Sequence, residues 1–426
     1  MMKASFKEEI EYLKSLANFT PAKVVSGEYE LGLGAIRELL SMAGNPQDNL
    51  KIIHVAGTNG KGSTIAFLSQ ILIESGLKVG VYTSPALLSV TEQIRINNTE
   101  ISEDDLAEGI RELRPYIEKM ASLGHKITTE FETITTLALL YFLKKSCDIV
   151  ILECGLGGEE DATNVITKSL LSAIASIGFD HMEILGDTLE KIAEKKAGII
   201  KENGTVVVLK GPEGVMKVFD DRCKAANARL IASADVLDDF PGVKLGLKGQ
   251  YQRINANLAI NCARALRDLG IDISDAAIRA GLENAVWPCR FEVIGSGPLV
   301  VIDGSHNIDG VRALKDSLVS AWPDKKFKFI AGVLKDKSYE KMMDVIIPFA
   351  DKFYAVKVDS PRALPAEDLA DYINSKNKSA VPFASIEEAV NTALSEASGE
   401  DVICIFGSLY YVGAARKILL DALCVY

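Results

Sequence analysis

The stretch Ile53–Thr64 reads IHVAGTNGKGST, and it decides how the first part of the chain folds. An apolar run typical of a β-strand leads into a glycine-rich turn, and residues with helical spacing follow directly. Glycines let backbone N–H groups converge on an anion, and the start of a helix adds positive potential. Lys61, inside the turn, can reach terminal phosphates. We therefore expect a strand, a phosphate-binding loop and a helix.

This loop departs from the usual phosphate-loop pattern. Gly62 separates Lys61 from the hydroxyl residue Ser63, and the spacing of the glycines is shorter than usual. A glycine-rich turn that binds nothing is the alternative interpretation. Because a lysine between Gly60 and Gly62 has no use in packing, the sequence favours phosphate binding.

The composition describes an ordinary globular protein with more than one domain. At 426 residues the chain is too long for one ordinary core, so two domains are expected. Hydrophobic residues make up 48% and charged residues 25% of the chain. The net charge of −11 and the pI near 5.1 argue against a nucleic acid or a membrane surface as partner.

The ends and the cysteines indicate a cytoplasmic protein. Met1–Glu9 is charged and lacks the apolar core of a signal peptide, and no apolar run is long enough to span a bilayer. The seven cysteines are scattered without paired metal-ligand spacing, and an odd number suits a reducing compartment.

Strand and helix patterns alternate after the phosphate loop, which predicts a doubly wound parallel sheet in an α/β domain. The polar, proline-interrupted stretch 84–98 is expected to be irregular, and 229–247 to be rich in β-structure. Strands are expected at 78–83, 148–153, 173–177 and 205–209. Helices are expected at 6–18, 34–43, 103–122, 132–145, 188–200, 214–227 and 275–284, and a further helix follows Gln250–Asn257 and ends near Leu269.

Two candidate ligand residues follow predicted strands. Glu153 ends the strand 148–153, where a magnesium ligand beside a phosphate loop belongs, although a solvated acid is the alternative. His181 follows the strand 173–177, so a ligand role and a structural role are both open. Lys196 lies near a helix end, where the pattern alone predicts a solvated last turn.

A second, smaller α/β domain of Rossmann-like type is expected after Trp287–Phe291 and Gly295–Pro298 break the pattern. We therefore place a P-loop ATP-binding domain at 1–293 and a C-terminal domain at 294–426. In the second domain, strands are expected at 299–303, 326–332, 352–357 and 402–406, and helices at 310–319, 338–348, 366–375, 385–397 and 410–421.

In this order the motifs resemble those of the folylpolyglutamate synthase/dihydrofolate synthase family, within the wider group of Mur-type ATP-dependent ligases. The resemblance covers nearly the whole chain. The motifs that show it are Gly57–Ser63, Thr83–Pro85, Glu153–Gly158, Asp161–Val165, Asp180–His181, Lys196–Ile200, Trp287–Phe291, Asp303–Asn307 and Gly407–Leu409.

The resemblance implies an ATP- and Mg²⁺-dependent ligase. A carboxylate of folate or dihydropteroate would attack the γ-phosphate of ATP, and L-glutamate would displace phosphate from the acyl phosphate to form an amide. Whether the chain adds the first glutamate or extends an existing tail is not readable from the sequence. We expect a cytoplasmic monomer.

The resemblance also implies roles for individual residues. Ser84 and Glu153 would hold one Mg²⁺, and His181 would hold a second together with Lys196, which carries a carbamate derived from CO2 in the family. The residues implied to bind ATP are Gly57, Thr58, Asn59, Gly60, Lys61, Gly62, Ser63, Asn255, Arg290 and Asp303, and the catalytic residues are Lys61, Lys196, His306 and Ser408.

Four positions depart from the family pattern. Ala86 stands where a histidine is usual, and Gln93 and Glu159 stand where arginines are usual. Lys195 replaces the acid that usually precedes the modified lysine. These changes leave two alternatives open: a ligase of the same mechanism with a different carboxylate acceptor, and a nucleotide-dependent switch or binding protein without ligation.

Overall fold

The computed structural model describes residues 2–17, 23–24, 26, 31–234 and 240–422. The chain forms two compact units, one made of Met1–Val243 with Asn255–Asn284 and the other of Lys244–Ile254 with Ala285–Tyr426. The predicted boundary lay between residues 293 and 294, whereas this division falls after Asn284 and gives the separate segment Lys244–Ile254 to the second unit.

The described part of the first unit contains a sheet of eight strands, parallel except at one edge. Strands β3 and β4 run antiparallel along that edge, and β1 pairs with β5 on one side and β6 on the other. In spatial order the strands are β4 (Thr99–Glu100), β3 (Ile94–Ile96), β2 (Val79–Tyr82), β5 (Ile149–Glu153), β1 (Ile52–Ala56), β6 (Leu171–Ile174), β7 (Thr205–Leu209) and β8 (Arg229–Ser233).

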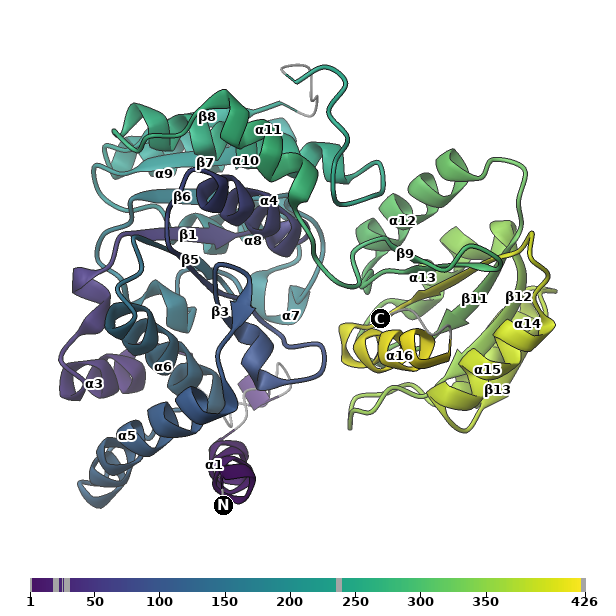
Figure 1. The fold of residues 1–426 in the computed structure, drawn as a ribbon, viewed down its shortest axis with the longest axis horizontal. Coiled ribbons are helices and arrows are strands. Elements are labelled where there is room, and N and C mark those ends of the chain that lie inside the picture. Colours follow the sequence, from purple (N-terminus) through teal and green to yellow (C-terminus); the bar gives the residue numbers. More distant parts are fainter. Residues whose placement is uncertain (1, 18–22, 25, 27–30, 235–239, 423–426) are drawn as a thin grey trace. The chain divides into compact units, whose positions relative to one another are not determined.

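Helices cover both faces of this sheet (Figure 1). Side chains of α1, α3, α5 and α6 form one core with β2 and β5, and those of α8 and α9 form another with β6 and β7. Helix α4 contributes to neither core and packs against α11. The helices are α1 (Met2–Ser15), α3 (Gly34–Met42), α4 (Lys61–Glu74), α5 (Glu103–Ser122), α6 (Glu130–Lys144), α7 (Met182–Leu185), α8 (Leu189–Ala197), α9 (Glu213–Ala225), α10 (Gln252–Asp268) and α11 (Asp275–Asn284).

The chain reverses its winding direction at β1 and β6. These strands are neighbours, yet β6 leads towards α8, which belongs to the core with α9, whereas β1 leads into α4, which packs against α11 instead. Ligands of doubly wound sheets bind at such a switch point, outside the carboxyl ends of the strands. The loops that follow β1 and β6 are therefore the first place to look for a site.

The second unit is a smaller α/β sheet. Phe329 stacks on Phe353 with ring centroids 5.2 Å apart and meets the edge of Phe406 at 5.5 Å, which builds an aromatic core. The spatial order is β13 (Ala380–Phe383), β12 (Ala350–Val356), β11 (Phe327–Ala331), β14 (Val402–Phe406), β10 (Leu299–Ile302) and β9 (Glu292–Ile294), and the helices are α12 (Ile308–Ala321), α13 (Tyr339–Ile346), α14 (Ala366–Ser375), α15 (Ile386–Glu396) and α16 (Leu409–Ala422).

This unit has its own switch point. Helices α12, α13 and α14 supply side chains to the core around Phe329, while α15 and α16 supply none and pack against each other. Adjacent strands β10 and β14 therefore lead into helices on different faces. The loops after β10 and β14 meet at the switch point, which is where this kind of sheet holds ligands.

The expected α/β class and two-domain architecture are confirmed, and several local expectations are wrong. The stretch 84–98 is not irregular, because Val90–Gln93 forms a 3-10 turn and β3 follows it. The Glu92 carboxylate accepts hydrogen bonds from the N–H groups of Leu87, Leu88 and Ser89 at 2.8, 3.0 and 3.0 Å. This local closure, together with antiparallel pairing to β2, overrides the polar composition.

Other boundaries also moved. Only β8 occupies the predicted β-rich segment 229–247, whose residues 235–239 lie outside the described part. The strand expected at 173–177 is β6, which ends at Ile174, and the edge strands β9 and β13 were missed.

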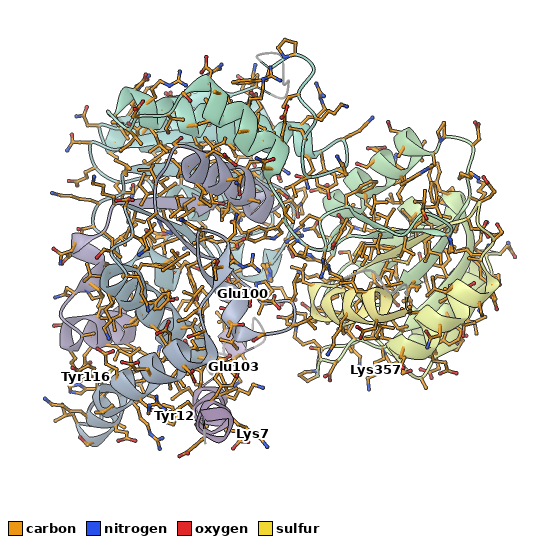
Figure 2. All side chains as sticks on the ribbon, viewed as in Figure 1. Lys7, Tyr12, Glu100, Glu103, Tyr116 and Lys357 are labelled. Atoms are coloured by element: carbon orange, nitrogen blue, oxygen red, sulfur yellow. The ribbon has the colours of Figure 1, made fainter. Side chains whose placement is uncertain are left out.

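Figure 2 shows Tyr12 on α1, where the Arg114 guanidinium of α5 lies 4.4 Å from the ring centroid. Within the described residues, no helix is long and apolar enough to cross a membrane.

Candidate active site

The loop after β1 forms hydrogen bonds with the segment that follows β6. Thr58 donates its N–H to the Ser176 carbonyl at 2.7 Å, and its hydroxyl donates to the Gly178 carbonyl and accepts from the Gly178 N–H, both at 3.1 Å. Gly57 has φ +148°, and a Cβ there would lie 2.8 Å from the Ala175 side chain. Only glycine fits so close an approach, so the loop keeps a fixed path below α4.

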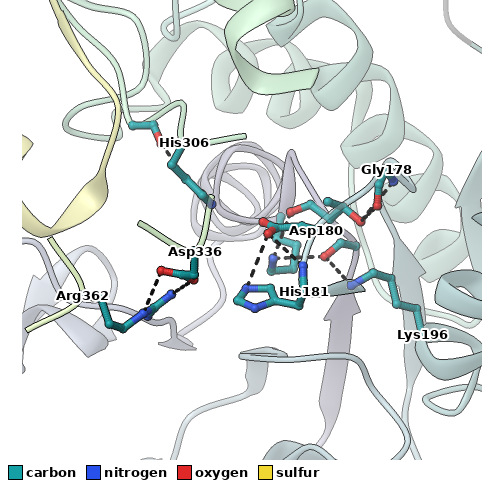
Figure 3. Close-up of polar contacts among 11 residues, drawn as sticks. Gly178, Asp180, His181, Lys196, His306, Asp336 and Arg362 are labelled. Atoms are coloured by element: carbon teal, nitrogen blue, oxygen red, sulfur yellow. Dashed lines mark hydrogen bonds and ion pairs between the residues drawn. The ribbon is translucent and has the colours of Figure 1, made fainter. Parts of the chain in front are cut away.

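Two lysines share one carbonyl in this loop. Lys61, the first residue of α4, donates from Nζ to the Gly57 carbonyl at 3.1 Å. Lys196 of α8 donates to the same oxygen at 3.0 Å, as Figure 3 shows for the Lys196 contact. A carbonyl oxygen has two lone pairs, so it can accept both bonds, but it cannot neutralise two positive charges. The arrangement concentrates positive potential at the phosphate loop.

Lys196 is buried, with 4% of its surface exposed, which makes the pattern-based expectation of a solvated lysine wrong. Burial and the neighbouring Lys61 charge lower the pKa of Lys196 to about 7. A large share of this amine is therefore neutral near pH 7. A neutral amine is the nucleophilic form of lysine.

Glu153 lies at the end of β5, where it is 6% exposed. Its Oε2 accepts a hydrogen bond from the Ser84 N–H at 3.2 Å, so the structure brings these two predicted metal ligands together. Side chains alternate along a strand, so Glu153 and Cys154 point to opposite faces. Cys154 lies in the core with α8 and α9, which leaves Glu153 for the other side.

Asp180 and His181 follow β6 closely. His181 has φ +50° and caps α7, and its N–H donates to Asp180 Oδ1 at 2.9 Å. Its Nε2 lies 3.9 Å from the same carboxylate oxygen, an interaction drawn in Figure 3. The imidazole therefore lies beside a carboxylate at the carboxyl end of the sheet.

A buried polar network below this edge was not recognised from the sequence. Asp161 accepts hydrogen bonds from the Leu156 N–H at 2.8 Å and from the N–H and hydroxyl of Thr163 at 3.0 and 2.5 Å. His54 Nε2 lies 2.8 Å from the Thr163 hydroxyl and 3.0 Å from Cys154 Sγ. Burial lowers the pKa of His54 to about 3, so this imidazole is neutral and structural. The network fixes the turn that follows Glu153.

Asn164 connects the turn after Glu153 to the end of α8. Its Nδ2 donates to the carbonyls of Glu159 and Gly198 at 2.9 and 3.3 Å, and its Oδ1 accepts from Lys201 Nζ at 2.6 Å. A Cβ on Gly158 would lie 2.9 Å from the carbonyl oxygens of both Lys195 and Lys196. The two backbones therefore touch directly, which sets the position of Lys196 relative to Glu153.

Two of the departures from the family pattern pair with each other. Lys195 Nζ lies 3.4 Å from Glu159 Oε2 and 3.7 Å from Glu160 Oε2. In the usual family pattern, position 159 is a positively charged arginine and position 195 is a negatively charged acid. In this chain the two charges are reversed, with Glu159 negative and Lys195 positive. The charges are thus exchanged within one pair rather than lost, and the pair lies on the surface with side chains 40% and 60% exposed.

Asn255, a predicted nucleotide contact on α10, lies against the phosphate loop. Gly60 has φ +88°, and a Cβ there would lie 2.4 Å from Asn255 Oδ1. Ser63 is buried in the first turn of α4, two residues after Lys61. The sequence-predicted residues of the first unit therefore gather at the carboxyl ends of β1, β5 and β6.

In the second unit the loops after β10 and β14 join through a hydrogen bond from the Gly407 N–H to the Ser305 carbonyl at 2.9 Å. This brings the segments that contain His306 and Ser408 to the switch point. His306 Nδ1 lies 2.8 Å from the Gly304 carbonyl, which can only accept, so Nδ1 carries the proton. Ser408 is 1% exposed, and its Oγ accepts from the Tyr410 N–H at 3.3 Å.

Asp303 is 2% exposed, and both of its carboxylate oxygens accept hydrogen bonds from residues of the second unit. One oxygen accepts from the Tyr251 hydroxyl at 2.6 Å and from the Phe291 N–H at 2.8 Å. The other accepts from the N–H of Ser305 at 2.9 Å and from the hydroxyl of the same residue. The carboxylate therefore organises the loops of the second unit, which the sequence did not indicate.

Arg290 lies between two residues in the left-handed region, Cys289 at φ +59° and Phe291 at φ +50°. Each such non-glycine residue costs on the order of 1–3 kcal/mol and persists only where its surroundings hold it. A Cβ on Gly304 would lie 2.9 Å from Arg290 Nη1 and 2.4 Å from Leu409 Cδ2. The guanidinium is thus close to the loop after β10 and the start of α16.

The residues present fit a magnesium ion that also binds phosphate. Among the residues that the structure describes, no group of three or more His, Cys, Asp and Glu side chains converges on one point. Mg²⁺ commonly binds one or two carboxylates and takes its remaining ligands from water and substrate phosphates. Buried Glu153 beside Ser84, next to the phosphate loop, matches that kind of donor set.

Two family models match the chain. The model described as Mur ligase middle domain matches residues 55–235, and the model described as Mur ligase, glutamate ligase domain matches residues 289–409. The dihydrofolate synthase/folylpolyglutamate synthase of Bacillus subtilis (strain 168) is 35% identical over 408 residues, which span 91% of this chain and 94% of that protein.

Solved structures give the same similarity. The folylpolyglutamate synthase of Mycobacterium tuberculosis complexed with ADP superposes with a TM-score of 0.88 at 27% identity, covering 98% of this chain and 99% of that one. FolC of Escherichia coli in complex with DHPP and ADP superposes with a TM-score of 0.85 at 29% identity, covering 98% of both chains. The similarity therefore includes both units and is not limited to the phosphate loop.

Proposed function

The chain belongs to the folylpolyglutamate synthase/dihydrofolate synthase family of Mur ligases, and we propose that it works through an acyl phosphate. It is an ATP-dependent ligase that joins L-glutamate to the carboxylate of a folate or dihydropteroate. The observation that best supports the mechanism is the pair of lysines, Lys61 and Lys196, on the carbonyl of Gly57. A nucleotide-binding loop with the Lys61 cation, and with a second lysine that can become an anionic metal ligand, suits the stabilisation of charge during phosphoryl transfer.

The proposed reaction has two steps. An oxygen of the acceptor carboxylate attacks the γ-phosphorus of ATP, and the bond to the β-phosphate oxygen breaks, which releases ADP. The amine nitrogen of glutamate then attacks the acyl carbon. The carbon–oxygen bond to phosphate breaks, phosphate leaves, and the amine gives up a proton.

In the first unit, the loop Gly57–Ser63 would hold the triphosphate, and Lys61 would exchange the Gly57 carbonyl for phosphate oxygens. Asn255 lies against Gly60 and would contact the nucleotide from α10. We assign ATP binding to the domain 1–293 and glutamate ligation to the domain 294–426. The match of the glutamate ligase model to residues 289–409 supports the second assignment.

Ser84 and Glu153 would hold one Mg²⁺, and His181 with modified Lys196 would hold a second. When bound, these ions neutralise phosphate charge and orient the γ-phosphate for attack. The support is the contact between Ser84 and Glu153 and the position of His181 after the neighbouring strand β6. Because the Glu153 side chain is buried, it loses little further conformational entropy when it binds the ion.

Lys196 would bind CO2 as a carbamate. Its neutral amine nitrogen forms a bond to the carbon of CO2 and releases one proton, which leaves an anionic oxygen ligand on the lysine. The lowered pKa of about 7 supports this step because it supplies the neutral amine. Once the carbamate has formed, Lys61 would be the remaining cation at the Gly57 carbonyl.

In the second unit, His306 and Ser408 would act on the acyl centre and the incoming glutamate. His306 holds its proton on Nδ1, so Nε2 carries the lone pair in the neutral ring and would take the proton that the amine loses. Ser408 lies at the start of α16, next to the loop of His306. Arg290 would contact the nucleotide phosphates, and Asp303 would act by holding the Arg290 segment as well as by any direct contact.

The preferred acceptor, a monomeric state and a cytoplasmic location stay predictions. The exchanged pair Lys195 and Glu159 supports an ordinary folate-type acceptor, because the pair keeps the usual two charges. Ala86 and Gln93 keep the alternative of another carboxylate open.

The test is ATP-dependent phosphate release by the purified chain with Mg²⁺ and L-glutamate. Dihydropteroate, tetrahydrofolate and no acceptor are compared, and the products are identified by mass. We expect phosphate release with either acceptor, matched by a mass increase of one glutamate. ATP binding without release on both acceptors would favour a different carboxylate, and ATP turnover that ignores glutamate would favour a nucleotide-dependent switch.

A further inference from the structure

An ion pair in the second unit determines how Arg290 is presented. The pair is a bidentate ion pair between Glu292, the first residue of β9, and Arg416, in the middle of α16. Arg416 Nε donates to both carboxylate oxygens at 2.9 and 2.8 Å, and Nη2 donates to Oε1 at 2.8 Å. Such paired bonds from one guanidinium fix direction as well as distance.

The same carboxylate also holds the backbone before Arg290. Glu292 Oε2 accepts a hydrogen bond from the Cys289 N–H at 2.9 Å. Cys289 is one of the two residues in the left-handed region that flank Arg290, and its carbonyl accepts from the Gly304 N–H at 2.9 Å. Both polar groups of this residue are therefore occupied.

The residue after Arg290 is held from the other side. The Phe291 N–H donates to Asp303 Oδ2 at 2.8 Å, and the Phe291 ring stacks on Trp322 with centroids 6.4 Å apart. Each flanking residue thus has its own anchor, Glu292 for Cys289 and Asp303 for Phe291. The backbone on both sides of Arg290 is therefore fixed, and its Nη1 lies close to Gly304.

The ion pair connects this turn to the other predicted site loop. Arg416 lies on α16, which begins directly after Ser408. Leu409, the first residue of α16, and Arg290 Nη1 both approach the same face of Gly304. Movement of α16 would therefore move the anchor of Cys289 and, through it, the turn that contains Arg290.

We propose that Glu292 and Arg416 are positioning residues that preorganise Arg290 for the phosphates of the bound nucleotide. This inference rests on the proposed role of Arg290 in ATP binding. A side chain held in its working direction before binding loses less conformational freedom when it binds. Neither Glu292 nor Arg416 needs to touch the nucleotide for this effect.

The test compares ADP affinity, measured by calorimetric titration, with the Michaelis constants for ATP and glutamate. In Arg416→Met we expect the Kd for ADP and the KM for ATP to rise about tenfold, with the KM for glutamate within about twofold of the parent value. Arg416→Lys keeps the charge but loses the two-pronged geometry, so it should show most of the same defect. Arg312→Met removes an exposed arginine from α12 of the same unit and is the matched control.

A double-mutant cycle separates positioning from simple destabilisation. If the pair acts through Arg290, adding Arg416→Met to Arg290→Met should cause little further loss of ADP affinity, because the same interaction is already gone. Full additivity of the two changes, or unchanged ADP affinity in both Arg416 variants, would overturn the inference. The titration does not depend on turnover, whereas absence of glutamate-dependent product formation by the parent chain would count against the proposed function instead.

Discussion

The phosphate loop of the first unit and the Asp303 loop of the second unit hold their charges in different ways. In the first unit, Lys61 and Lys196 both donate to the Gly57 carbonyl, and Lys61 also donates to the Thr58 carbonyl at 3.4 Å. Both lysines would change partners when a substrate or CO2 arrives. In the second unit, Asp303 is bonded to three residues of its own fold. The lysines of the first unit can therefore take part in the reaction, whereas the Asp303 carboxylate holds the loops of the second unit in place.

The largest expected effect comes from removing the more deeply buried lysine. Lys196→Ala should reduce turnover at least about 100-fold, because the variant loses the proposed anionic ligand of the second Mg²⁺. Bicarbonate should not restore the activity, whereas a short carboxylate should restore it in part. The measurement is the rate of ADP formation at saturating substrates.

Lys191→Ala, on the exposed side of the same helix, is the control and should keep activity within about twofold of the parent. Full activity of Lys196→Ala would contradict the carbamate assignment.

Asp303→Ala should instead cost stability in the second unit. The Tyr251 hydroxyl and the Phe291 and Ser305 N–H groups would lose their acceptor, which predicts a loss of about 3 kcal/mol in the free energy of unfolding. Both tryptophans, Trp287 and Trp322, belong to this unit, so urea unfolding followed by tryptophan fluorescence reports on it directly.

Asp309→Ala, which removes an exposed carboxylate from α12, should change the midpoint little. An unchanged midpoint in Asp303→Ala would show that the hydrogen bonds around this carboxylate contribute nothing to stability.

The buried lysine also predicts a pH dependence for the first unit. The folded pKa of about 7 lies below the usual lysine value of about 10.4, so between these values the unfolded chain binds more protons than the folded chain. Stability should therefore rise with pH from 7 upwards, by at most about 1.4 kcal/mol per pH unit from this group.

The measurement is urea unfolding followed by far-ultraviolet circular dichroism at pH 7, 8 and 9, in buffer free of CO2 and Mg²⁺. Lys196→Met should show a flatter slope than the parent chain. Equal slopes in the two proteins would mean that Lys196 titrates as an exposed lysine.

The smallest expected effect concerns the exchanged surface pair. Exposed ion pairs contribute about 0.2–1 kcal/mol, so Glu159→Arg, which puts two cations together, should lower kcat/KM about threefold. The double change Glu159→Arg and Lys195→Glu should restore the parent value. A double variant that is worse than either single one would mean that the exchanged charges select the acceptor.

The sequence predicted the strand, the glycine-rich loop and the helix around Lys61 well because their signals are local. Glycine spacing, a preceding strand and a following helix all lie within a few residues of Lys61. Lys196 was misjudged from the pattern, although a signal existed. It follows Ile192 and Ala193 at helical spacing, on the stripe that α8 buries, whereas Lys195 lies off that stripe.

The second unit was harder to predict because its constraints are distant in sequence. Asp303 meets Tyr251 across 52 positions, and no spacing rule points from one to the other. Cys289 and Phe291 have positive φ without being glycine, so nothing in their residue types reveals the turn around Arg290. The expected α/β class was readable there, but the geometry of the site was not.

The measurement that tests the acyl phosphate most directly follows the oxygen atoms of the acceptor. Dihydropteroate or tetrahydrofolate with ¹⁸O at both oxygens of the reacting carboxylate is incubated with the chain, ATP, Mg²⁺ and L-glutamate, and the released phosphate is analysed by mass. An acyl phosphate requires one carboxylate oxygen to leave with the phosphate, so we predict one ¹⁸O in each phosphate released. Phosphate that contains no ¹⁸O would contradict the mechanism and would show that ATP is hydrolysed without activation of the carboxylate.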